Sequence, residues 1–210
     1  MKIDLHVHAS ERSGCSVSGE EEIIRAAIGF GLDALAFSDH QLLVPPERLA
    51  ELNAKFAPFR IFSGIEIHTV EEEDVLVIGV PDPRIEKRAW TYPALFDFVR
   101  DRAGFMAVAH PFRYRDTVNL DFQERVPDAL EVSSFNIRPE REPLIRSLAE
   151  RLGCGLICAS DAHSTDIVGI CRLDVEGEPA DNAALVRLLK GGRYRLDADA
   201  GRLAKVRAGV

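Results

Sequence analysis

This chain lacks most features of secreted, membrane-spanning or disulfide-rich proteins. Only four cysteines occur in 210 residues, and no two form a Cys-x-x-Cys pair. We therefore expect reduced, mostly structural thiols in a cytoplasmic protein and no disulfide scaffold. The N-terminus, Met1-Lys2-Ile3-Asp4, is charged at once and predicts no signal peptide. No apolar run reaches the ~20 residues that span a bilayer, so we expect no membrane association.

Positive charge is also scarce. The chain has 26 Lys and Arg against 34 Asp and Glu, a formal net charge of −8. This acidity argues against broad nucleic-acid binding. It does not exclude a phosphorylated substrate, because bound cations can supply a local positive field. The length predicts one domain over residues 1–210, with no internal repeat or linker, and the sequence leaves the oligomeric state open.

Apolar, β-rich runs alternate with helical patterns. Strands are predicted at residues 2–8, 33–38, 60–67, 75–80, 104–109, 129–133 and 155–160. Helices are predicted at about 18–30, 47–56, 92–103, 139–152 and 182–189. The alternation favours a parallel α/β architecture. A doubly wound open sheet is the rival, but no Gly-rich phosphate turn follows the first run, so we favour a closed or nearly closed barrel.

Histidines and carboxylates gather where these runs end. The motifs are Asp4-Leu5-His6-Val7-His8, Ser38-Asp39-His40, Gly64-Ile65-Glu66-Ile67, Ala109-His110-Pro111 and Ser160-Asp161-Ala162-His163. Residues two apart on a strand point to the same face, so His6 and His8 form a pair, and Asp161 and His163 form another. One histidine alone would more often be a core residue. A set at several strand ends predicts a multinuclear site, because imidazole and carboxylate suit Zn, Mn and Fe.

In this order the five motifs resemble those of the PHP (polymerase and histidinol phosphatase) domain family, over about residues 2–171. The resemblance implies a distorted seven-stranded (β/α)7, TIM-like barrel that binds two or three divalent ions (Mn, Zn or Fe). The ligands that it implies are His6, His8, Glu66 and Asp161 for the first metal, Glu66 and His110 for the second, and His40 and His163 for the third. Glu66, Asp161 and His163 would also act in catalysis.

Two positions depart from the family pattern. A histidine that relatives place before the fourth strand corresponds here to Asp74, either a ligand that would favour Mn or Mg or a solvated residue. Where relatives place a third-metal ligand in the first loop, this chain has Ser13 and Gly14, and Glu11 is the nearest carboxylate. We therefore count Asp74 and Glu11 as candidate ligands. His68, the sixth histidine, is a candidate ligand, proton donor or substrate contact, or a loop residue without chemistry.

The leading hypothesis from the sequence is a metal-dependent phosphoesterase that acts on a small phosphomonoester or nucleotide through a metal-activated hydroxide. Arg113 and Arg138 are candidate phosphate contacts, since the planar guanidinium binds phosphate in bidentate fashion. Asn136 is a candidate for orienting substrate or water. The alternatives are an amidohydrolase-like enzyme of C–N bonds, a nuclease, and a non-catalytic domain. The first would often use a bridging lysine, and no predicted strand end carries one.

Overall fold

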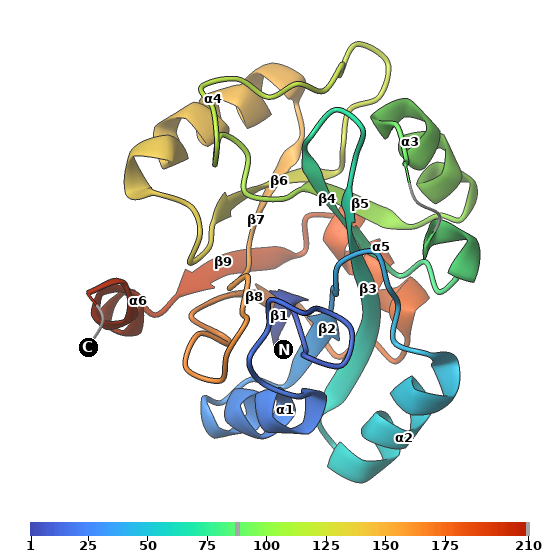
Figure 1. Cartoon of the computed structure of the whole chain (residues 1–210), viewed down its shortest axis with the longest axis vertical. Coiled ribbons are helices and arrows are strands. Elements are labelled where there is room, and N and C mark those ends of the chain that lie inside the picture. The colour runs from blue at the N-terminus through green and yellow to red at the C-terminus, as the bar shows by residue number, and fades with distance from the viewer. Residues whose placement is uncertain (87–88, 209–210) are drawn as a thin grey trace.

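The computed structural model describes residues 1–86 and 89–208 of the chain. Within them, one curved, nearly closed sheet holds nine strands in the order β7-β6-β5-β4-β3-β2-β1-β8-β9 (Figure 1). The strands are β1 (Lys2–Val7), β2 (Ala34–Phe37), β3 (Arg60–His68), β4 (Asp74–Ile78), β5 (Phe105–Val108), β6 (Ala129–Ser133), β7 (Gly155–Cys158), β8 (Cys171–Val175) and β9 (Tyr194–Ala198). The α/β class agrees with the prediction, but the expected count of seven strands was wrong.

Helices cover the outside of this sheet (Figure 1). They are α1 (Glu20–Gly29), α2 (Pro46–Phe56), α3 (Tyr92–Asp101), α4 (Glu142–Leu152), α5 (Asn182–Lys190) and α6 (Ala200–Arg207), with short 3-10 turns η1 (Pro83–Glu86) and η2 (Pro139–Arg141). Helix α4 ends where Gly153 takes a left-handed conformation, φ 68°, which glycine adopts without steric cost. The predicted helix over 139–152 is thus a 3-10 turn followed by α4. No helix of the described residues is both long and apolar enough to cross a membrane.

The sheet is not parallel throughout, which corrects a second expectation. Strand β4 runs antiparallel to both β3 and β5, with His68 opposite Asp74 in the β3–β4 ladder. The cause is the short link between β3 and β4, because a parallel connection needs a crossover of a dozen or more residues. The start of β4 therefore lies at the same edge as the carboxyl ends of β3 and β5.

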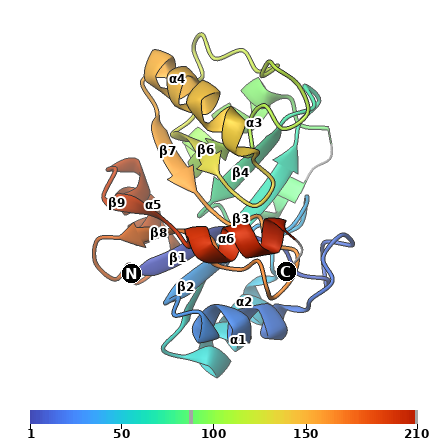
Figure 2. The same cartoon turned by 90° about the vertical axis from the view of Figure 1, so that its left-hand side faces the viewer.

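Strand β1 closes the barrel by pairing differently along its length. Its first residues pair with the antiparallel β8, whereas its last residue, Val7, forms a parallel bridge with Ala162 beyond β7. Two backbone hydrogen bonds hold this seam, from the His8 N–H to the Ala162 carbonyl at 2.8 Å and from the Ala162 N–H to the His6 carbonyl at 3.1 Å. Strands β8 and β9 pair antiparallel with α5 between them in the chain, and α6 follows β9 on the outside of the sheet (Figure 2).

Two apolar clusters pack the interior. One joins β1, β2 and α1, with Ile23 and Ile24 of α1 fully buried. The other joins β3 to β6 with α3 and α4, and it includes the fully buried Tyr92, whose hydroxyl donates to the Arg125 carbonyl at 2.7 Å. Full burial of a large apolar side chain stabilises a fold by roughly 1.5–3 kcal/mol. Polar side chains inside such a frame therefore need a specific reason to be there.

Candidate metal centre

Strand ends bring the predicted ligands together at one mouth of the barrel. His6 lies inside β1 and His8 just beyond it, and both side chains are fully buried. The bridge between Val7 and Ala162 aligns the two chain segments, so that Asp161 and His163 flank Ala162 beside the histidine pair. The Nε2 atoms of His6 and His8 each lie 3.3 Å from Asp161 Oδ1.

Glu66 occupies the middle of the centre and is 1% exposed. Its Oε1 lies 3.3 Å from His6 Nε2 and 3.0 Å from His110 Nε2. Its Oε2 lies 3.5 Å from His8 Nε2 and 2.7 Å from His40 Nδ1. One buried carboxylate thus faces four imidazoles that come from three different strand ends.

Four overlapping triads can each offer three ligand atoms that lie within 4.8 Å of one another. They are His6/His8/Glu66, His6/His110/Asp161, Glu66/Asp74/His110 and His8/His40/His163. Every member is among the ligands predicted from the sequence, and their role as ligands stays a prediction. The overlap at Glu66 fits neighbouring cations that share a carboxylate.

Several polar atoms of the centre form no well-oriented hydrogen bond. Within residues 1–86 and 89–208, these buried atoms are His6 Nε2, His8 Nε2 and Glu66 Oε2, although Glu66 Oε2 lies 2.7 Å from His40 Nδ1. Buried polar atoms are nearly always satisfied in native proteins, and an unsatisfied one costs about 1–3 kcal/mol. Lone pairs of imidazole and carboxylate that converge in this way fit divalent cations, so the donor set suits the metals that the sequence implied.

A buried carboxylate behind the centre, Glu131, was missed in the sequence. It lies in β6, is fully buried, and accepts from His6 Nδ1 at 3.0 Å and from the His110 backbone N–H at 2.8 Å. This bond places the proton of neutral His6 on Nδ1 and leaves Nε2 free to bind a cation. The hint available in the sequence was one acidic residue inside an apolar β run.

Two further buried carboxylates, Asp39 just beyond β2 and Asp4 in β1, bond to residues that neighbour the predicted ligands. Asp39 accepts from the Ser13 hydroxyl and from the Ala9 N–H, both at 2.7 Å, and Ser13 lies 3.4 Å from His8 Nδ1. Asp4 accepts from the backbone N–H of Ser160 at 3.0 Å, next to Asp161. Because Asp4 is buried, its pKa rises to about 6, although hydrogen bonds from Ser160 and its neighbours oppose the shift.

The two departures from the family pattern have different places in the structure. Glu11 accepts from the Glu20 backbone N–H at 3.0 and 3.1 Å, so it caps the start of α1 and belongs to none of the four triads. Asp74 joins the centre, because antiparallel β4 begins at the barrel mouth. Its Oδ2 lies 3.8 Å from His110 Nε2, and its Oδ1 lies 2.7 Å from Nδ1 of the exposed His68. His68 therefore contacts the centre through Asp74, at the carboxylate oxygen other than the one near His110.

The predicted substrate contacts are not equally close. Asn136 Nδ2 donates to Asp161 Oδ2 at 2.5 Å, and the Arg113 guanidinium lies 3.6 Å from the same oxygen. Arg138 is exposed at the start of η2, and its side chain makes no hydrogen bond or ion pair with the described residues. Arg113 and Asn136 therefore border the centre, whereas Arg138 is free in solvent.

The charges of the centre depend on one another. Burial alone would lower the pKa of His6, but the carboxylates of Asp161, Glu66 and Glu131 outweigh it and raise that pKa well above its ordinary value. Burial alone would raise the pKa of Glu66, but neighbouring imidazoles, His6 foremost, hold that pKa well below its ordinary value. For His8 burial dominates and lowers the pKa. The buried carboxylates are therefore stabilised by nearby positive charge, which either protonated imidazoles or bound cations can supply.

Two of the predicted ligands lie in a strained backbone conformation. His110 and Asp161 both adopt positive φ, 27° and 53°. This region is unfavourable for residues with a Cβ and costs of order 1–3 kcal/mol, and it recurs at functional sites. The strained backbone turns each side chain inward at the end of its strand.

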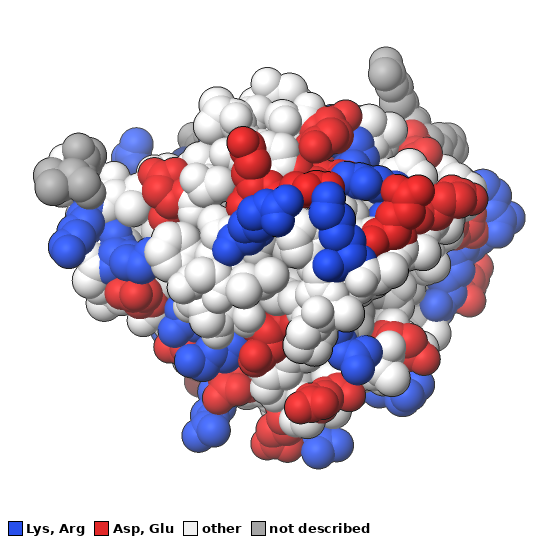
Figure 3. Space-filling model, turned by 90° about the horizontal axis from the view of Figure 1, so that it is seen from below, with Lys and Arg blue, Asp and Glu red and all other residues white. Residues whose placement is uncertain are grey.

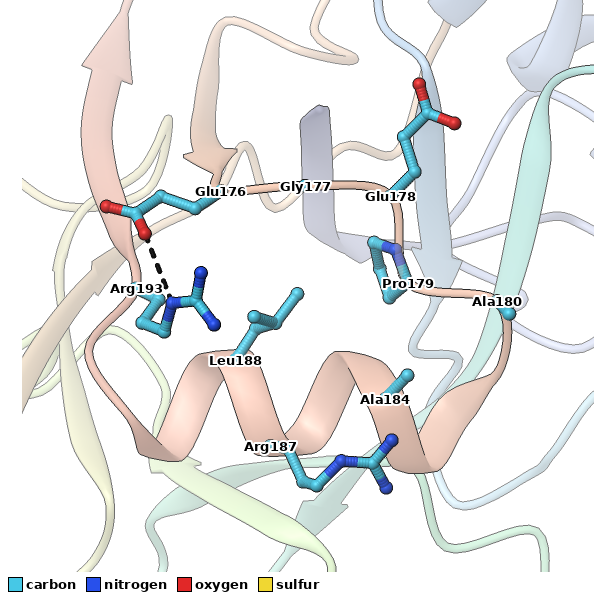
Figure 4. Close-up of a pocket in the computed structure, with 9 residues that line it drawn as sticks. All are labelled: Glu176, Gly177, Glu178, Pro179, Ala180, Ala184, Arg187, Leu188 and Arg193. Atoms are coloured by element: carbon cyan, nitrogen blue, oxygen red, sulfur yellow. Dashed lines mark hydrogen bonds and ion pairs between the residues drawn. The ribbon is translucent and has the colours of Figure 1, made fainter.

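A separate surface pocket lies between α5 and the turn that follows β8 (Figure 4). Its lining residues are Glu176, Gly177, Glu178, Pro179, Ala180, Ala184, Arg187, Leu188 and Arg193. We call it the α5 pocket. It contains none of the predicted site residues, and Glu176 pairs with Arg193 across it at 3.1 Å.

The fold is shared with several solved structures of low sequence similarity. PsfC from Pseudomonas syringae PB-5123 matches with a TM-score of 0.70 and 19% identity, over 99% of this chain and 95% of that one. A two-domain protein from Bacteroides vulgatus is described as containing a predicted PHP-like metal-dependent phosphoesterase. It matches with a TM-score of 0.72 and 16% identity, over 94% of this chain and 64% of that one. An amidohydrolase from Chromobacterium violaceum with bound sulfate and no metal matches with a TM-score of 0.66 and 18% identity, over 96% of this chain and 100% of that one.

These similarities define the fold of the chain. No protein-family model matches the sequence, and no curated protein matches it either. Function must therefore be argued from the centre itself.

Proposed function

We propose that this chain is a PHP-type, metal-dependent phosphoesterase that hydrolyses a small phosphorylated molecule. One observation carries the proposal: Glu66 is buried among four imidazoles, and it and its neighbours have lone pairs without partners. The fold it shares with a protein described as PHP-like and phosphoesterase-containing is consistent with it. Two or three divalent ions (Mn, Zn or Fe) would act there as Lewis acids that activate water and offset charge on phosphoryl oxygens.

The residues divide these tasks. His6, His8, Glu66 and Asp161 would hold one ion; Glu66, Asp74 and His110 a second; and His40 and His163 a third. The Glu131 carboxylate fixes the tautomer of His6. Nδ1 of His163 lies 3.1 Å from the Asp161 carbonyl, so it can donate there and leave Nε2 free to bind the third ion.

Arg113 would bind the phosphoryl group. Its guanidinium lies beside Asp161 and stays partly open to solvent. Guanidinium donors match phosphoryl oxygens in bidentate geometry. Asn136 holds Asp161 by its side-chain amide, which orients the carboxylate toward His6 and His8.

An amidohydrolase-like activity on C–N bonds is the second candidate, and the fold shared with the Chromobacterium violaceum protein favours it. A bridging lysine would often occur in such a centre, but the four described lysines, Lys2, Lys55, Lys190 and Lys205, are all exposed. A nuclease finds less support. Acidic and basic side chains intermix on the face shown in Figure 3, without a broad basic area among its described residues, whereas nucleic-acid binding favours one.

The test is a phosphate-release screen after reconstitution with Mn, Zn or Fe. Sugar phosphates, nucleotides and amino-alcohol phosphates form one panel, and N-acyl amino acids with cyclic amides form the other. We expect phosphate release that disappears in Asp161→Ala. Activity confined to the C–N panel would replace the phosphoesterase with the second candidate.

A further inference from the structure

Half of the exposed large apolar side chains lie in loops at the mouth of the metal centre. Eight large apolar side chains are exposed among the described residues, and four of them lie in loops at this end. These four are Val17, Leu42, Val70 and Tyr114, with 81%, 42%, 58% and 71% of their surface exposed. They follow β1, β2, β3 and β5, and we call them the apolar rim. Single exposed apolar residues are ordinary, but a group around a polar site marks a binding surface.

We propose that the apolar rim binds the apolar organic group of a phosphoester, with Tyr114 as the contact for an aromatic ring. The proposal rests on the proposed function for the polar end of this ligand. It names the substrate class as phosphoesters of apolar, preferably aromatic, alcohols rather than sugar phosphates.

Tyr114 is connected to the centre through one side chain. The Arg113 guanidinium lies 3.6 Å from Asp161 Oδ2 and 5.0 Å from the centre of the Tyr114 ring. A phosphoryl group bound by Arg113 would thus have an exposed aromatic face directly behind the guanidinium. Aromatic rings offer large apolar area for contact with other rings.

Val17 and Leu42 border the other side of the centre. The Val17 N–H donates to the His163 carbonyl at 2.9 Å, which fixes Val17 next to a predicted ligand. Leu42 follows Gln41, whose N–H donates to the Glu66 carbonyl at 2.9 Å. This side is open to solvent, since the His40 side chain is 44% exposed and that of His163 is 25% exposed.

The charges and the rim together define two parts of one ligand. Cations and Arg113 suit a compact anion, and the rim suits an apolar group that extends outward from it. The hydroxyl groups of a sugar phosphate would stay hydrated and would gain little from contact with the apolar rim. An apolar alcohol would instead bury part of this exposed apolar surface.

The kinetic test compares 2-phenylethyl phosphate with ethyl phosphate, whose leaving alcohols differ only by the ring. For the metal-loaded wild type we expect kcat/KM to be roughly tenfold higher for the ring-bearing ester, mainly through KM. In Tyr114→Ala this ratio should fall to about one. Leu144→Ala, which removes an exposed leucine from α4 on another face, is the matched control and should keep the wild-type ratio.

A binding measurement separates this proposal from the proposed function. Calorimetry with the non-hydrolysable 2-phenylethylphosphonate and ethylphosphonate should show roughly tenfold tighter binding of the former, and Tyr114→Ala should abolish the difference. Phosphate release with equal kcat/KM for both esters would contradict the proposal for the apolar rim and leave the phosphoesterase function standing. A ring preference in binding without any turnover would support the rim and overturn the phosphoesterase. Equal affinities of both phosphonates would overturn the rim.

Discussion

Charged side chains in the metal centre and in the α5 pocket differ in burial and in pairing. In the centre, His6, His8 and Glu66 are almost wholly buried and have polar atoms without partners. In the α5 pocket, Glu176 and Arg193 are 64% and 60% exposed and bind each other (Figure 4). An exposed pair is worth about 0–1 kcal/mol, whereas buried unpaired groups are costly. Burial without partners, rather than density of charge, therefore marks the place for a ligand.

The largest effect should come from breaking the centre while leaving the α5 pocket intact. Asp161→Ala should lower kcat by about a thousandfold or more, since its oxygens face both His6 and His8. Thermal unfolding of the metal-free protein should change little, because ligands at a barrel mouth contribute little to core packing. Glu176→Ala, the matched change in the α5 pocket, should leave both measurements unchanged. Equal kinetics of the two variants would remove the centre from the mechanism.

The next effect concerns the carboxylate behind the ligands. Glu131→Ala should weaken metal binding about 10- to 100-fold, because His6 loses the acceptor that fixes its tautomer. Glu131→Gln keeps one acceptor oxygen and should lose less. Metal titration followed by calorimetry measures both. Wild-type affinity in Glu131→Ala would show that the buried carboxylate only packs.

A smaller change is expected at Asp74, which lies at the half-open edge of the centre. Asp74→His should shift metal preference from Mn toward Zn, because imidazole suits Zn. Asp74→Ala should weaken one of the bound metals and leave another in place. Competitive titration with Mn and Zn gives the preference, and an unchanged order of affinity in Asp74→His would place Asp74 outside the ligand set.

The smallest effect is a pH dependence of stability: the metal-free protein should become less stable as pH rises, whereas the stabilisation by bound metal should increase. In the metal-free protein, carboxylates overcome burial and raise the pKa values of His6, His40 and His110 above 6.5. Their contribution is full below pH 6.5 and is lost as pH rises through the raised values. His8, whose pKa burial lowers, reduces the effect.

Scanning calorimetry should therefore show a falling Tm for metal-free protein above pH 6.5. The increase in Tm on adding metal should grow with pH over the same range, because metal and protons compete for the imidazoles. A metal-induced increase that shrinks as pH rises would contradict this competition.

The sequence predicted best what apolar patterning controls. Strands β1 to β7 all formed near their predicted bounds, because each is a short apolar run between turn residues. Strands β8 and β9 were both missed. Strand β8 is short and interrupted by Arg172 and Asp174, and the side chains of β9 are mostly exposed, so neither gives an apolar run. The antiparallel direction of β4 was missed although the link of five residues after His68 is too short for a parallel crossover.

The site was predictable where residues form motifs and not where long-range pairing decides. The histidine and aspartate pairs at the ends of β1 and β7 stood out by their spacing. Glu131 did not, because its partner His6 is 125 residues away. Glu11 was chosen for its proximity in sequence, and in the structure its carboxylate accepts from the Glu20 N–H at the start of α1, so its role as a ligand stays a prediction.

The most direct test of the account is the number of metal ions bound per chain. After reconstitution with Mn or Zn, elemental analysis of wild-type protein should give at least about two ions per chain, since the triads overlap at Glu66. Glu66→Ala should lose most of this metal and keep its fold by circular dichroism, while Glu176→Ala should retain it. Fewer than about one ion per wild-type chain, or unchanged metal in Glu66→Ala, would contradict a shared-carboxylate metal centre.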